Sequence, residues 1–61
     1  MIIQSRLIDE SKTCVCLKNI DGFFWVLVFK NGKLVHENRH LHQEVAVDEA
    51  DKLYHYWKTH E

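Results

Sequence analysis

Residues 23–33, FFWVLVFKNGK, decide the fold of this chain. The first seven, from Phe23 to Phe29, are all apolar and rich in aromatic and β-branched types, which is typical of a strand that is apolar on both faces. Asn31-Gly32 follows, and Asn-Gly between two β-prone runs is the strongest short-range signal for a tight hairpin. The stretch therefore predicts a central strand that needs cover on both sides.

Three polar turns divide the first forty residues. They lie at residues 9–12, 19–22 and 30–33, and the last two each contain a glycine, which adopts a positive φ without steric cost. The runs between them predict four strands, over residues 2–8, 13–19, 23–30 and 33–39. Because the loops are short, consecutive strands are expected to pair as an antiparallel meander.

The C-terminal segment changes its hydrophobic period from two to that of a helix. Ala50, Leu53, Tyr54 and Trp57 recur at helical spacing, and Asp48 is in position to cap the start of a helix over residues 48–60. Residues 40–47 have strand parity and fit three alternatives: an extension of the fourth strand, a short fifth strand, or a crossing to the helix. The expected architecture is one α+β domain over residues 1–61, a four-stranded antiparallel meander with one C-terminal helix on one face.

The expected register decides which face the helix covers. If residues 19–22 form a four-residue turn with a bulge at Gly22, Leu17 lies opposite Trp25; the Asn31-Gly32 loop places Asn38 opposite Trp25 on the other side. The helix, through Leu53, Tyr54 and Trp57, is then expected on the aromatic face, made up of Phe23, Trp25, Leu27 and Phe29. A one-residue slip of the hairpin would exchange the two faces.

That register leaves the second face of the sheet without a helix over it. Monomers rarely expose a large apolar patch, so this valine face predicts a homodimer or a protein partner that binds Phe24, Val26, Val28 and Val35. The alternative is that the sheet curls and its first strand closes over the patch. We therefore expect a small non-enzymatic interaction protein, similar in size and style to the accessory proteins of phages and mobile elements.

A nucleic-acid-binding module is the alternative function. Sheet aromatics stack on bases in several such modules, and Lys30, Lys33 and Arg39 could hold phosphates. The charge pattern gives this little support, since the net charge is −1 and residues 1–42 carry six basic against four acidic side chains.

A small zinc site is a second alternative, because Cys14 and Cys16 share one strand face and His40 and His42 follow the fourth strand. The spacing differs from a Cys-x-x-Cys knuckle, and two sulfurs at this spacing lie about 6.5 Å apart along a strand, too far for a disulfide. We expect no cofactor.

Catalytic and membrane functions have little support in the sequence. There is no glycine-rich phosphate loop and no nucleophile with an identifiable base, although the five histidines allow a pH-sensitive association. No apolar run approaches 18 residues and no signal-peptide pattern occurs, so we expect no membrane span and a cytoplasmic location.

Overall fold

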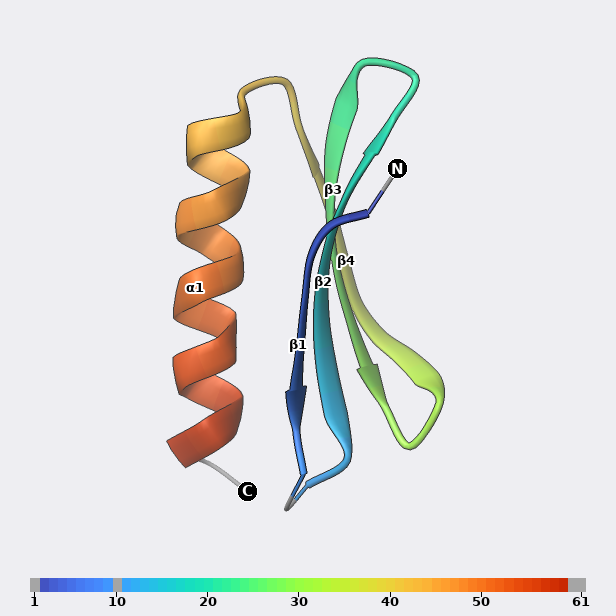
Figure 1. The fold of residues 1–61 in the computed structure, drawn as a ribbon, viewed down its shortest axis with the longest axis vertical. Helices are drawn as coiled ribbons and strands as arrows, with labels where there is room; N and C mark the ends of the chain where they lie inside the picture. The colour runs from blue at the N-terminus through green and yellow to red at the C-terminus, as the bar shows by residue number, and fades with distance from the viewer. Residues whose placement is uncertain (1, 10, 60–61) are drawn as a thin grey trace.

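The computed structural model describes residues 2–9 and 11–59. Four strands form one antiparallel sheet in the order β1-β2-β3-β4, and a single helix packs against one face of it (Figure 1). The elements are β1 (Ile2–Ile8), β2 (Thr13–Ile20), β3 (Phe23–Lys30), β4 (Lys33–His40) and α1 (Gln43–Thr59). The predicted α+β meander is confirmed, and the predicted strand bounds agree to within one residue.

The helix begins five residues earlier than the sequence pattern predicted. Its first turn starts at Gln43, and the N–H of Ala46 donates to the carbonyl of His42 at 3.2 Å. The predicted cap, Asp48, lies inside the helix, where its carboxylate pairs with the ammonium of Lys52 at 2.9 Å. The predicted end at residue 60 lies outside the described residues.

Both β-hairpins with a glycine turn have two-residue loops. Asp21 and Gly22 have φ angles of 52° and 81°, and Asn31 and Gly32 have 53° and 81°, so both central residues of each loop are left-handed. This is the type I′ geometry, whose twist matches that of the flanking strands. The expected four-residue turn with a bulge at Gly22 is therefore wrong, and Ile20 pairs directly with Phe23.

The shorter loop shifts β2 by one residue against β3. Leu17 pairs with Val26 rather than Trp25, and Val15 pairs with Val28 rather than Leu27. A one-residue shift turns every side chain of a strand to the other face. Val15 and Leu17 therefore join the valine face of β3, and the two cysteines join the aromatic face.

A bulge shifts the β3–β4 register in the same way. Leu34 lies opposite Phe29, as predicted, but the pairing then shifts, so that His36 lies opposite Val28 and Arg39 opposite Trp25. The predicted partner of Trp25, Asn38, lies instead opposite Val26. The bulge thus turns Asn38 to the helix side of the sheet and Arg39 to the other side.

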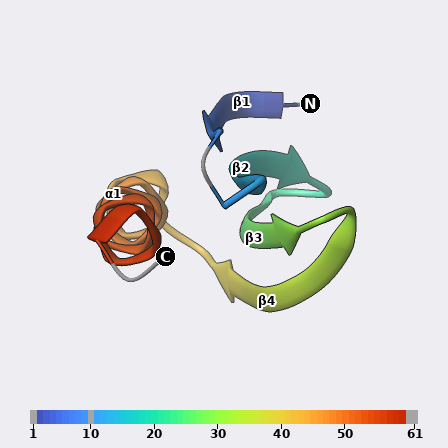
Figure 2. The ribbon, with the colours of Figure 1, turned by 90° about the horizontal axis from the view of Figure 1, so that it is seen from below.

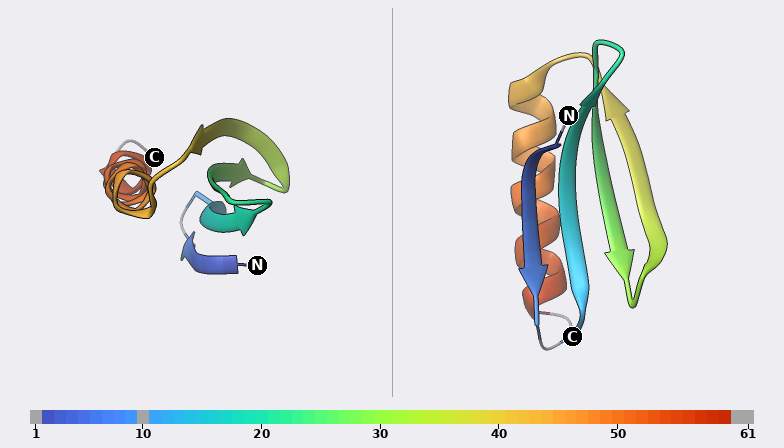
Figure 3. Two further views of the ribbon diagram at one scale, coloured as in Figure 1. Left: turned by 90° about the horizontal axis from the view of Figure 1, so that it is seen from above. Right: turned by 45° about the vertical axis from the view of Figure 1, so that its right-hand side comes forward.

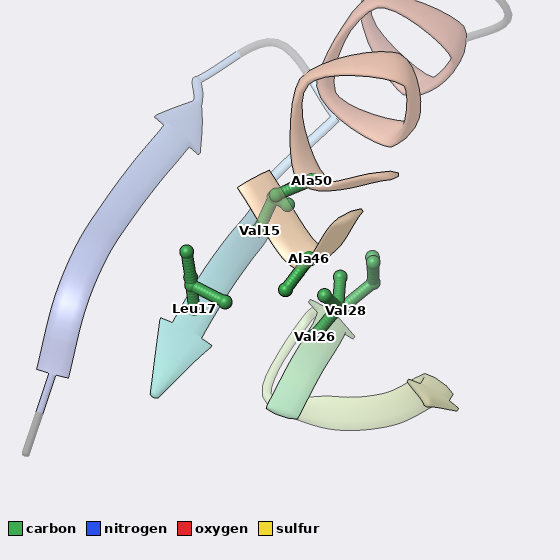
Figure 4. Packing of buried hydrophobic residues seen from close by; sticks show 6 residues of the cluster. All are labelled: Val15, Leu17, Val26, Val28, Ala46 and Ala50. Carbon is green, nitrogen blue, oxygen red and sulfur yellow. The ribbon is translucent and has the colours of Figure 1, made fainter. Parts of the chain in front are cut away.

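The core lies between α1 and the valine face. Figure 4 shows its buried side chains meeting between the helix and the two central strands; they are Val15, Leu17, Val26, Val28, Ala46 and Ala50. The two alanines face the sheet and are almost fully buried, and their small side chains let the helix approach the sheet closely.

The helix therefore covers the face that was expected to be free. Val26 and Val28 are fully buried, and Phe24 packs against the core cluster. Leu53, Tyr54 and Trp57 do dock on the sheet, but on its valine face. The prediction that Phe24, Val26 and Val28 form an exposed surface is wrong, and only Val35, in the β4 bulge, is exposed.

Polar contacts tie α1 to both edge strands of the sheet. On β4, the carboxylate of Glu49 accepts hydrogen bonds from His40 Nε2 and from Asn38 Nδ2, each at 2.9 Å at its shortest. On β1, Arg6 donates to Asp51 at 3.0 Å. The helix is thus held at its two flanks as well as through the core.

The hydrogen bonds to Glu49 also set its pKa. Burial alone would raise the pKa of this carboxyl, but the hydrogen bonds from His40 and Asn38, together with the nearby His40 and His36, lower it below its ordinary value of 4.5. The contact therefore favours the ionised carboxylate.

The first prediction concerns the core. Leu17→Ala removes a fully buried side chain and should lower the free energy of unfolding by about 2–5 kcal/mol, measured by urea denaturation. The matched control is Leu41→Ala, because Leu41 is 67% exposed, and it should change stability by less than about 0.5 kcal/mol. Equal effects of the two variants would contradict the assignment of the core face.

The second prediction follows from the pKa of Glu49. Because the folded-state pKa is lowered, the stabilisation is present above pH 4.5 and is lost as the pH falls through the folded-state value. Glu49→Gln should remove this part of the acid sensitivity, whereas Glu44→Gln, on the exposed first turn of the same helix, should retain it. Urea denaturation at pH 7 and at about pH 3 measures the difference. If Glu49→Gln and the parent lost the same free energy of unfolding at low pH, the proposed role of ionised Glu49 would be contradicted.

Candidate functional site

The face of the sheet opposite α1 has no described helix or strand over it. Figure 2 and Figure 3 show the helix on one side of the strands only. We call this surface the open face. By strand alternation and register it carries the following residues: Ile2, Ser5, Leu7, Cys14, Cys16, Lys18, Ile20, Phe23, Trp25, Leu27, Phe29, Leu34, Glu37 and Arg39.

The open face is predominantly apolar. The aromatic side chains of Phe23, Trp25 and Phe29 are half-buried, and Leu27 is 9% exposed although no element covers it. Towards the margins, Leu7 and Leu34 are exposed. The aromatic rings and their neighbours on the twisted sheet thus shield one another in part and leave an apolar surface.

Three charged side chains accompany this apolar surface. Lys18 lies on β2, and Glu37 and Arg39 lie two residues apart on the edge strand β4. The guanidinium of Arg39 stands 4.5 Å from the ring centroid of Phe23 and 5.7 Å from that of Trp25, which is cation–π geometry. With two positive charges and one negative, the face has no strong bias of charge.

A pair of free thiols lies on the same face. The sulfurs of Cys14 and Cys16 are 3.5 Å apart, and Ser5 Oγ from β1 is 3.4 Å from the first and 3.7 Å from the second. The expected separation of about 6.5 Å is wrong, because it is the spacing of the backbone and the two side chains converge. Burial raises the pKa of the Cys16 thiol, and the contact with Cys14 raises it further.

The basic patch predicted for nucleic acid does not form on one face. Arg39 lies on the open face, but the ammonium of Lys30 stands 5.3 Å from the ring centroid of Trp57 on the helix, and Lys33 pairs with Lys30 at the hairpin tip. Lys18, which the sequence analysis did not single out, is the second cation of the open face.

The four residues predicted as metal ligands also separate. His40 faces the helix and bonds Glu49, whereas the cysteines lie on the opposite side of the sheet, and His42 lies in the β4–α1 connection. Within residues 2–9 and 11–59 no group of three or more histidine, cysteine or acidic side chains is placed to hold a metal ion. The structure therefore does not bring Cys14, Cys16, His40 and His42 together as one ligand set.

A hollow of about 620 Å³ lies beside the N-terminal half of the helix and is lined by Arg6 and by residues of α1 that include Glu44 and Asp51. In its wall Arg6 donates to Asp51 at 3.0 Å, so these two charges are already paired. His36 lies on the helix side, with its Nε2 buried and without a hydrogen-bond partner among the described groups.

Comparison with family models, with curated proteins and with solved structures finds no match for this chain. No helix among the described residues is both long enough and apolar enough to cross a lipid bilayer.

The aromatic face was expected to lie under the helix, because residues 19–22 were expected to form a four-residue turn. The signal that would have found it is the dipeptide Asp21-Gly22, which favours a two-residue type I′ loop as strongly as Asn31-Gly32 does. A two-residue loop at this position is enough to place Val15 and Leu17 on the helix side of the sheet.

The third prediction tests the placement of Arg39 over the aromatic rings. In a double-mutant cycle, Arg39→Ala and Phe23→Leu should show a coupling energy of about 0.5–1 kcal/mol in urea denaturation. The control cycle replaces Arg39→Ala by Lys58→Ala, because Lys58 stands over Tyr54 on the helix and should not couple to Phe23. Additive effects in the first cycle would show that the stacking contributes nothing.

Proposed function

We propose that this protein is a small non-enzymatic interaction module that forms a homodimer through its open face. The observation that carries the proposal is an apolar sheet surface, with Trp25 at its centre and exposed leucines at its margins, that α1 leaves uncovered. Surfaces of this kind on a small domain mark association sites.

The size of the face supports a second copy as the occupant. It runs along the 32 Å axis of the Cα trace and across its 15 Å axis, because the 19 Å axis separates the helix from the sheet (Figure 1). These two extents bound an area of about 480 Å², which is more than half of the roughly 800 Å² that each partner buries in a standard interface. A chain of 61 residues also has a small core, and oligomerisation is one of the ways such scaffolds gain stability.

The charges on the face favour a copy of the same chain over a strongly charged partner. A two-fold axis beside β4 would bring Glu37 of one copy against Arg39 of the other, and each contact would occur twice. The cation–π contacts hold Arg39 at the surface of the apolar patch, where its guanidinium can pair with the carboxylate of Glu37 from the second copy.

Single-stranded nucleic acid is the second candidate. Phe23, Trp25 and Phe29 lie on the open face with Lys18 and Arg39, so aromatic rings that could stack on bases share a surface with two cations. Among the described residues, Lys18 and Arg39 are the two cations of that face, and Glu37 lies beside them, so the homodimer is favoured.

The fourth prediction compares two exposed apolar residues on different faces. Leu34 is 48% exposed on the open face, and Val45 is 49% exposed on the helix. Leu34→Glu should weaken dimerisation at least about tenfold, equivalent to about 1.4 kcal/mol, whereas Val45→Glu should leave it unchanged. Sedimentation analysis over a micromolar concentration series measures the association, and circular dichroism checks that both variants fold.

Two outcomes would contradict the homodimer. One is a parent protein that stays monomeric throughout the series, and the other is equal dissociation constants for Leu34→Glu and Val45→Glu. Titration of the parent with a single-stranded oligonucleotide, at two salt concentrations, tests the second candidate. Salt-dependent binding by a monomer, lost in Arg39→Ala, would replace the homodimer with nucleic-acid binding.

A further inference from the structure

The thiol pair on the open face forms a compact donor set with a serine hydroxyl. The sulfurs of Cys14 and Cys16 and the hydroxyl oxygen of Ser5 lie at mutual distances of 3.4, 3.5 and 3.7 Å, so the three atoms make a nearly equilateral triangle. The cross-strand pair Ser5 and Cys16 and the strand spacing of the cysteines hold these side chains on one face. The arrangement is complete within one chain and does not depend on the dimer.

The ligand count indicates which ions such a site could take. A structural zinc site needs four strong ligands, and here, among the described residues, no histidine or carboxylate joins the thiols in a metal-binding group. Thiolates are soft ligands that select copper(I), an ion that two or three donors satisfy. We propose that Cys14 and Cys16 form a dithiolate site for copper(I), with Ser5 as a positioning residue.

Binding in this site exchanges protons for metal. Two S–H bonds break, two Cu–S bonds form, and two protons pass to solvent, while copper keeps its oxidation state. The bound group carries one net negative charge, which the ammonium of Lys18 on the same strand and face partly balances. Since protons compete with the metal for both sulfurs, affinity should rise with pH.

The two cysteines differ in their exposure to solvent. In the single chain, Cys16 is 8% exposed and is held by its surroundings, whereas Cys14 is half-exposed and open to an incoming ion. Ser5 can donate its hydroxyl proton to either thiolate, which orients the pair. Ser5→Ala should weaken copper binding about tenfold without abolishing it, as expected for a group that acts through the ligands.

The fifth prediction is a competition experiment on the reduced protein without a histidine tag. Copper(I), supplied under anaerobic conditions, should bind with one ion per chain against a chromophoric copper(I) chelator and should protect both cysteines from alkylation, read by mass spectrometry. Cys14→Ser should abolish both effects, and Cys16→Ala should do the same; circular dichroism checks the fold of each variant. Zinc(II) at the same concentration should give no protection.

Two controls separate this site from other sources of binding. His42→Asn should bind copper(I) as the parent does, because His42 lies away from the thiols. Leu34→Glu should also retain the site, so that failure of the dimer and failure of the copper site are distinguishable. Failure of the parent to retain copper(I), binding unchanged in Cys14→Ser, or one ion per two chains would overturn the proposal.

Discussion

The pairing register of β2 and β3 is the constraint on which the rest of the structure depends. The Asp21-Gly22 loop adopts positive φ at both residues and joins the strands with only two residues between them. This sets Val15 and Leu17 beside Val26 and Val28, so four aliphatic side chains share one face of the two central strands. The helix packs on that face because its own contacting residues, Ala46 and Ala50, are small enough for close approach.

The same register places the alternate side chains of β2 and β3 on the other face. Cysteines, aromatic rings and one arginine come together there, from three strands, without any helix to cover them. A 61-residue chain with one helix can cover only one side of a sheet whose central strand is apolar on both. The proposed dimer and the proposed dithiolate site both follow from this imbalance and share the open face, with the thiols on β2 and the proposed two-fold axis beside β4.

The elements were predictable because local signals specify them. Polar turns, glycine positions and the change from strand to helix period fixed the four strands and the existence of α1. The start of the helix was less predictable, because Val45 and Val47 alternate as strand residues do; tertiary packing of Ala46 decides that this segment is helical. The existence of an uncovered apolar face was predictable from the sequence, but its residues were not. It was expected to contain Val26 and Val28, and it contains Trp25 instead.

By itself, the sequence determined that this protein is a small antiparallel meander with one helix and one surplus apolar face. Only the tertiary structure decided which face that is. The physical reason is that side chains alternate along a strand, so a difference of one residue in a turn or bulge moves a whole row of side chains across the sheet. The close approach of the two cysteine sulfurs could not be predicted from the sequence either. Strand spacing separates the backbones of Cys14 and Cys16, and only their side-chain conformations bring the sulfurs to 3.5 Å.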